Sequence, residues 1–186
     1  ACVVASNPKA YALERAKNAG VETEVLVRKE FSTQDAYDDA LLGLLERHNI
    51  DLVVLAGSNA AWTHPVLYQR LVQAKHDNPQ MKVVVIDPRR TATCDIADLH
   101  LALAPGSDAG LFVGLLNVIQ GTDEWPVERV AAFCGLSPQD IGTFYDWFMT
   151  APRAITLYTM GINQSASGSD KCNAIINVHL ASGKFN

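Results

Sequence analysis

The chain has 186 residues, which is enough for one domain with a sizeable core and too few for two full domains. Hydrophobic residues make up 48% and charged residues 19%, a composition typical of globular rather than disordered proteins. Lys and Arg number 15 against 20 Asp and Glu, and the resulting net charge of -5 argues against general affinity for nucleic acid or an anionic membrane.

The apolar runs indicate no transmembrane segment, because each is far shorter than the roughly 20 residues that span a bilayer. Residues 1–17 have no basic region followed by an uninterrupted apolar stretch, so they do not resemble a secretory signal. The four cysteines are widely scattered without CxxC spacing, which favours reduced thiols over a disulfide framework or a zinc site. We therefore expect a cytoplasmic protein.

Six short runs rich in Val and Ile alternate along the chain with longer stretches of helical period. The candidate strands are residues 2–6, 23–27, 51–56, 82–87, 99–103 and 154–159. This alternation is typical of parallel sheets covered by helices. It predicts a three-layer, Rossmann-like α/β fold, with a mostly parallel sheet of about six strands and helices on both faces. All 186 residues are expected to form one domain.

Four segments between or after these strands carry helix signals: residues 6–20, 32–49, 107–121 and 137–150. The first has Pro8 near its start and Gly20 just past its end, as helices commonly do. The second begins with Ser and Thr and carries acids in its first turns. The third is nearly all apolar, which predicts a helix buried on most sides. The fourth begins with Ser-Pro.

The turns after the third and fourth strands are candidate ligand sites, since open parallel sheets bind ligands at the carboxyl ends of their strands. Gly57 allows close backbone approach, and Ser58 and Asn59 can donate hydrogen bonds; an ordinary capped turn is the alternative. In the next turn, Asp87 can accept from a ribose or a guanine edge. Arg89 and Arg90 can bind a phosphate there, although solvated loop charges explain them equally well.

The later two turns have the same character. Asp108, after Gly106 and Ser107, stands at the start of the apolar helix, where it either caps that helix or accepts two N–H bonds from guanine. The last turn has glycines around two neutral amides, including Gln164, which suit a polar heterocycle better than a metal. Several such turns on one sheet fit a large, extended cofactor that carries phosphates.

Three segments within residues 51–186, "GSNAAWTHPVLYQRL", "VVVIDPRRTATCDIADLHLALAPGSDAGL" and "YTMGINQSASGSDKCNAIINVHLASGKFN", resemble molybdopterin-dependent oxidoreductases. Within that family they are most similar to cytoplasmic assimilatory nitrate reductases, and "TMGINQ" with the following helix is the most specific part. The resemblance implies that this region binds one arm of a bis(molybdopterin guanine dinucleotide) cofactor. The implied contacts are Gly57, Ser58, Asn59, Asp87, Arg89, Arg90, Gly106, Ser107, Asp108, Met160 and Gln164.

Residues 1–57 carry a different resemblance. "SNPKAYALERAKNAG" and the pairing of "AYDDAL" with "DLVVLAG" are similar to glycinamide ribonucleotide formyltransferase. Neither family's catalytic segments are recognisable in the chain, so no residue is assigned to catalysis or to a metal. We interpret the chain as a chimera of a formyltransferase-like segment, residues 1–57, and a molybdopterin-oxidoreductase-like segment, residues 58–186, joined into one sheet.

Three functions follow from this interpretation. The first is a fragment of a nitrate reductase that keeps part of the guanine dinucleotide site and has no turnover alone. The second is a catalytically inert α/β scaffold whose motifs are relics, and the third is a formyltransferase-like transferase. The expected partner is a guanine nucleotide or dinucleotide cofactor. Incompletely covered apolar edges also predict a homodimer.

Overall fold

The computed structural model describes most of the chain, namely residues 2–5, 7–9, 11–18, 20, 22–33, 36–37, 39–40, 43 and 50–184. All six predicted strands are present: β1 (Cys2–Ala5), β2 (Glu22–Val25), β3 (Leu52–Ala56), β4 (Lys82–Ile86), β5 (Leu99–Leu101) and β6 (Ala154–Tyr158). The α/β class and the parallel pairing are therefore confirmed. Most of the helix predicted over residues 32–49 lies outside the described residues.

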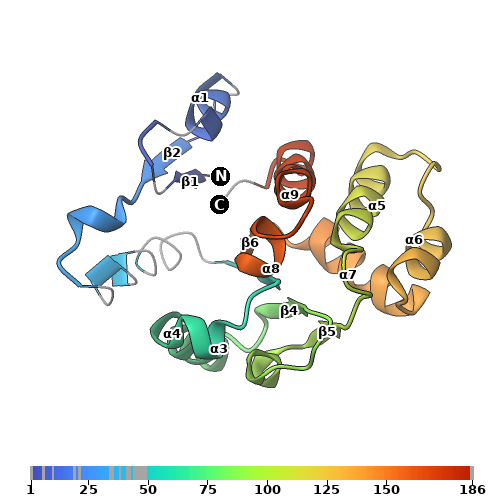
Figure 1. Ribbon diagram of the computed structural model, residues 1–186, viewed down its shortest axis with the longest axis horizontal. Helices are drawn as coiled ribbons and strands as arrows, with labels where there is room; N and C mark the ends of the chain where they lie inside the picture. Colours follow the sequence, from blue (N-terminus) through green and yellow to red (C-terminus); the bar gives the residue numbers. More distant parts are fainter. Residues whose placement is uncertain are drawn as a thin grey trace.

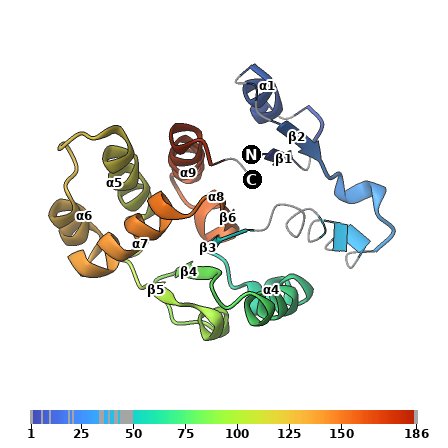
Figure 2. The same cartoon turned by 180° about the vertical axis from the view of Figure 1, so that it is seen from behind.

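The six strands do not form one sheet, so the prediction of a single sheet of about six strands was wrong. β1 and β2 pair with each other in a two-stranded parallel sheet, and the other four strands form a second sheet in the order β5-β4-β3-β6. The unit of β1, β2 and helix α1 (Tyr11–Asn18) stands apart from the larger sheet in both ribbon views (Figures 1 and 2). A short apolar run does not specify which strand it will pair with, so sequence could not separate the two sheets.

Helices cover both faces of the four-stranded sheet (Figure 1). One face carries α3 (Ala60–Thr63), α4 (Pro65–Asp77) and the 3-10 helix η2 (Ala92–Ile96). The other carries α5 (Asp108–Gln120), α6 (Val127–Cys134), α7 (Pro138–Thr150) and α9 (Gly168–Ser182). The short α8 (Met160–Asn163) follows β6, and the 3-10 helix η1 (Arg28–Glu30) follows β2.

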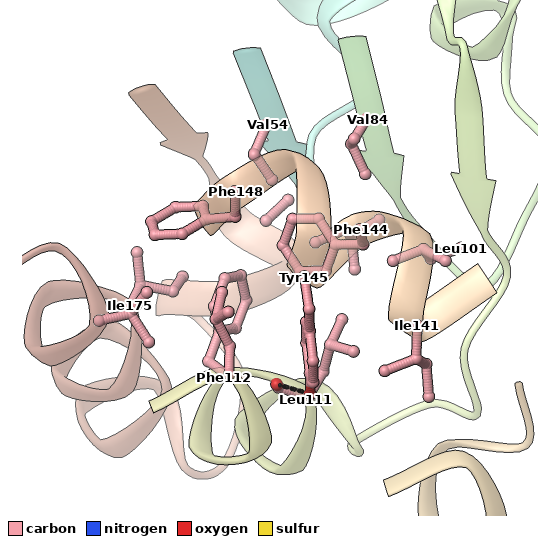
Figure 3. Packing of buried hydrophobic residues seen from close by; sticks show 14 of the residues in the cluster. Val54, Val84, Leu101, Leu111, Phe112, Ile141, Phe144, Tyr145, Phe148 and Ile175 are labelled. Carbon is pink, nitrogen blue, oxygen red and sulfur yellow. Dashed lines mark hydrogen bonds between the residues drawn. The ribbon is translucent and has the colours of Figure 1, made fainter. Parts of the chain in front are cut away.

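The larger core lies between the sheet and helices α5, α7 and α9. Val54 and Val84 of the sheet meet an aromatic layer led by Phe112, Phe144 and Phe148, each at most 1% exposed (Figure 3). The Tyr145 hydroxyl donates to the Leu111 carbonyl at 2.6 Å within this layer, so its polar end is satisfied despite burial. The predicted burial of the apolar helix at 107–121 is thus confirmed for α5.

A second core fills the opposite face, where alternate strand residues such as Val53, Val83 and Val85 pack against Leu71 and Cys94. Cys94, Cys134 and Cys172 are free thiols. At the amino-terminal edge of the sheet, Arg153 Nε donates to Asp51 Oδ2 at 3.0 Å. This pair joins β3 and β6 at the amino ends of the two strands. The predicted turns lie at the opposite, carboxyl ends.

Candidate functional site

The turns after β3 and β6 are in backbone contact. The Gly161 N–H donates to the Gly57 carbonyl at 3.2 Å, and the Thr159 hydroxyl donates to the same oxygen at 3.0 Å. A β-carbon on Gly57 would lie 2.9 Å from the Gly161 carbonyl carbon, and Gly57 also has a φ of +56°. Only glycine satisfies both the left-handed backbone and this approach. The first and fourth predicted turns therefore meet.

The turns after β3 and β4 are joined by side chains. The Thr93 hydroxyl donates to Asn59 Oδ1 at 3.1 Å and accepts from the Ala61 N–H at 3.1 Å. The Gly57 N–H donates to the Ile86 carbonyl at 2.8 Å, which fixes the strand ends together. Asn59, which was predicted as a ligand contact, therefore also holds the segment after β4 in position.

Asp87 lies at the second turn with only 6% of its surface exposed. Its Oδ1 accepts from the Arg89 N–H at 2.8 Å, and the His100 Nε2–H donates to its main-chain carbonyl at 2.9 Å, which ties this turn to β5. The Arg89 side chain is 78% exposed, with its Nε 3.8 Å from Asp87 Oδ1, and Arg90 is also exposed. The carboxylate is therefore held inward while both guanidinium groups face solvent.

The third turn places a glycine where its backbone is accessible. Gly106 has a φ of +91° and nothing within 4 Å of the position a β-carbon would take. Ser107 is 4% exposed, and its hydroxyl donates to the Ala104 carbonyl at 2.7 Å. The Cys134 thiol donates to the Ser107 carbonyl at 3.6 Å, and burial raises the pKa of Cys134, so this group stays a thiol at neutral pH.

Asp108 and Lys171 join the third turn to α9, the helix that follows the fourth turn. Lys171 Nζ lies 2.6 Å from Asp108 Oδ2, with the two side chains 5% and 9% exposed. Asp108 begins α5 and Lys171 lies in the first turn of α9, and these two helices pack together. The sequence predicted Asp108 as a helix cap or a guanine acceptor, and the structure adds an ion pair that neither alternative included.

The two remaining predicted residues are open to solvent. Met160 is 56% exposed at the start of α8, and Gln164 is exposed just after it. The chain then turns tightly, because a β-carbon on Gly168 would lie 2.3 Å from the Asn163 carbonyl oxygen. Met160 and Gln164 are therefore exposed beside a turn whose backbone is closely packed.

A cavity of about 310 Å³ opens beside the first and fourth turns. Its lining includes Ser58, Ala60 and His64 from the segment after β3, Thr159 from the segment after β6, and Tyr37 from the segment before β3. Thr63 Oγ1 is 2.9 Å from His64 Nδ1. Burial, followed by the neighbouring Cys172, raises the pKa of Tyr158, which also lines the cavity, to about 12. Its phenol therefore stays neutral at physiological pH.

Contacts link these turns at one sheet edge: the first turn contacts both the second and the fourth, His100 ties the second turn to β5, and Lys171 ties the third turn to α9, the helix that follows the fourth turn. Sequence reasoning found the turns but missed the groups that connect them, namely Thr93, His100, Thr159 and Lys171. Such an edge, built from small residues after parallel strands, is the arrangement of Rossmann-like α/β ligand-binding domains.

Sequence comparison gives the family. A sequence model described as molybdopterin oxidoreductase matches residues 18–186, so the chain belongs to the molybdopterin oxidoreductase family. Nitrate reductase from Klebsiella oxytoca is 70% identical over 154 residues, which cover 74% of this chain and 18% of that protein. Nitrate reductase from Synechocystis sp. is 35% identical over 157 residues, which cover 73% of this chain and 22% of that protein.

A solved structure agrees in fold. Acetylene hydratase from Pelobacter acetylenicus matches with a TM-score of 0.61 at 19% identity, over 99% of this chain and 30% of that one. The two nitrate reductases, at 70% and 35% identity, confirm the predicted likeness to nitrate reductases. The chain spans about a fifth of the length of these curated relatives. The family model begins at residue 18, so it includes most of the segment in which a formyltransferase was expected.

The residues at this edge fit the phosphate-bearing part of a molybdopterin cofactor, which the family implies. Two exposed guanidinium groups, an accessible glycine backbone and a buried hydroxyl without a partner, Thr91 Oγ1, supply donors in the second and third turns. Among the described residues, no helix is long and apolar enough to cross a membrane.

Proposed function

We propose that this chain is the part of a nitrate-reductase-like enzyme that holds one arm of a molybdopterin guanine dinucleotide. The observation that carries the proposal is the set of contacts that joins the first turn to the second and fourth turns, and the third turn to α9. Because the Gly57–Gly161 and Asp108–Lys171 contacts connect segments that are distant in sequence, the donors and acceptors lie along one edge. An extended dinucleotide requires such an edge.

Each turn has a distinct role in this proposal. Arg89 and Arg90 bind the phosphates, and the accessible backbone of Gly106 allows them to approach closely. Asp108 accepts from the guanine edge, and Asp87 accepts from the ribose or the base. The remaining contacts come from Gly57, Ser58, Asn59, Ser107, Met160 and Gln164.

The molybdopterin group would supply oxidation–reduction chemistry when it is bound. The residues of this chain bind and orient it, and we assign none of them to catalysis. Nitrate reduction, as the activity of a whole enzyme, would need segments beyond those that match here, since the chain covers 18% of the Klebsiella oxytoca nitrate reductase. A cytoplasmic location, and a dimer formed through exposed apolar side chains, remain parts of the proposal.

Calorimetric titration with GDP tests the phosphate and guanine contacts. We expect saturable binding, which also raises the apparent stability because the ligand binds only the folded state. The double variant Arg89→Gln/Arg90→Gln should weaken GDP binding about tenfold or more, since charge-assisted hydrogen bonds are lost. Arg129→Gln is the matched control, because Arg129 stacks on Trp125 at 4.4 Å instead. If millimolar GDP gives no measurable heat of binding, the proposal is wrong.

A second candidate is an inert scaffold assembled from two parents, with a formyltransferase-like first segment. The separate β1–β2 sheet does not support it, because the two segments were expected to join in one sheet. It predicts a cooperative thermal transition that neither GDP nor any other nucleotide shifts. Turnover of glycinamide ribonucleotide with 10-formyl folate would instead support the formyltransferase alternative.

A further inference from the structure

The Lys171–Asp108 pair is unusual within this molecule because both side chains are almost fully buried. The other ion pairs of the described residues have at least one partner that is a fifth or more exposed. Lys171 is 4% exposed as a residue, and its ammonium group carries only donors. A buried ammonium must keep an acceptor, so it fixes the oxygen that it contacts, Asp108 Oδ2 at 2.6 Å.

We propose that Lys171 is a positioning residue that sets the base specificity of this edge by fixing the rotation of Asp108. This inference rests on the proposed function. With Oδ2 held by Lys171, Oδ1 is the carboxylate oxygen left to accept from the ligand. A single acceptor contacts N1–H, which guanine and hypoxanthine share and adenine lacks. Adenine has an acceptor at N1, so it meets an unfavourable pairing.

The geometry makes a sharp prediction for Asp108→Asn, which keeps the size of the side chain. Lys171 can accept no hydrogen bond, so it must retain the amide oxygen of the new side chain. The amide NH2 then takes the place that faces the ligand. A donor in that place matches N1 of adenine and opposes N1–H of guanine. The substitution should therefore reverse the preference from GDP to ADP.

The test measures the affinities of GDP, IDP and ADP by calorimetry for the whole chain and its variants. For the unsubstituted chain we expect GDP and IDP to bind within about threefold of each other, and ADP about tenfold more weakly. Asp108→Asn should bind ADP more tightly than GDP. Asp140→Asn is the matched control, since Asp140 also lies in the first turn of a helix, α7, and should leave the order unchanged.

The double variant Lys171→Met/Asp108→Asn separates positioning from simple packing. It removes both charges together, so it avoids an unpaired buried ion and should fold. Without the ammonium, the amide introduced by Asp108→Asn can take either orientation. The affinities of the double variant for ADP and GDP should then differ by no more than about threefold. A loss of all three affinities by one common factor would show that Lys171 is only structural.

Two further outcomes keep the inference distinct from the proposed function. A tenfold or greater preference for GDP over IDP in the unsubstituted chain would mean that both Asp108 oxygens contact guanine. If the Asp108→Asn variant still binds GDP more tightly than ADP, the proposed role of Lys171 is wrong, although the chain still binds nucleotides. If the unsubstituted chain binds none of the three nucleotides, the proposed function fails, and this inference fails with it.

Discussion

Gly57 and Gly161 touch through their backbones, and this contact joins the turns at the ends of the two neighbouring strands β3 and β6. A β-carbon on Gly161 would lie 2.8 Å from both the α-carbon and the carbonyl oxygen of Gly57. Since both obstacles are backbone atoms, neither can move without displacing a strand end. The proposed binding edge depends on this approach.

Gly161→Ala should therefore destabilise the fold and disturb the edge. Overpacking of this kind costs about 1–3 kcal/mol, which urea unfolding would measure. Gly142→Ala is the matched control, because Gly142 lies in helix α7 with nothing within 4 Å of its β-carbon position. That change should be neutral or stabilising by up to about 1 kcal/mol. Equal effects of the two substitutions would contradict the assignment of a close contact.

Lys171→Met should be far more damaging than the loss of a surface ion pair. It leaves the Asp108 carboxylate buried without its cation, which costs about 3–5 kcal/mol. Arg70→Met removes the partner of Asp39, but those side chains are 48% and 54% exposed, so the expected cost is at most about 1 kcal/mol. Urea unfolding of both variants checks the contrast, and a loss below about 1 kcal/mol for Lys171→Met would contradict the burial of this pair.

His179 gives the fold a dependence on pH. Its Nδ1–H donates to the Lys184 carbonyl at 2.5 Å, and its Nε2 accepts from the Thr156 hydroxyl at 2.8 Å. Burial lowers the pKa of His179 below its ordinary value of 6.5, so the folded state favours the neutral ring. Neutral His179 therefore stabilises the fold above pH 6.5. This stabilisation is lost as the pH falls from 6.5 toward the pKa of His179 in the folded state.

Unfolding in urea between about pH 8 and about pH 5 measures this effect. The unsubstituted chain should lose stability across the acidic half of that range, and His179→Gln should lose less. His76→Gln serves as the control, since the His76 side chain is 81% exposed. A His179→Gln profile parallel to that of the unsubstituted chain would show that another group governs the acid sensitivity.

Asn117 holds the loop between α5 and α6. Its Oδ1 accepts from the Thr122 hydroxyl at 2.6 Å and from the N–H groups of Glu124 and Trp125 at 3.1 Å each. Asn117→Ala should cost about 1–3 kcal/mol, because the three hydrogen bonds to the buried Asn117 amide are lost. Hydrogen exchange should show faster exchange at the amides of Glu124 and Trp125. Unchanged protection there would mean that Asn117 does not fix the loop.

Sequence patterns predicted the strands well because each is a short, strongly apolar run bounded by a turn. The turns were predicted for the same reason, since their residues follow directly from the strand ends. Lys171 could not be found this way. A lysine in the first turn of a helix usually extends into solvent, and only tertiary packing of α9 on α5 buries it. The partner of a strand is equally nonlocal, which is why the separate β1–β2 sheet was not anticipated.

Chemical-shift mapping with GDP is the decisive test of whether the four turns form one nucleotide-binding edge. Amide signals should move together, with one affinity, in all four turns: residues 57–59, 87–90, 106–108 and 160–164. The amides of Arg153 and Asp51, at the opposite sheet edge, should stay unchanged. Shifts confined to one turn, or no shifts at millimolar GDP, would contradict the account.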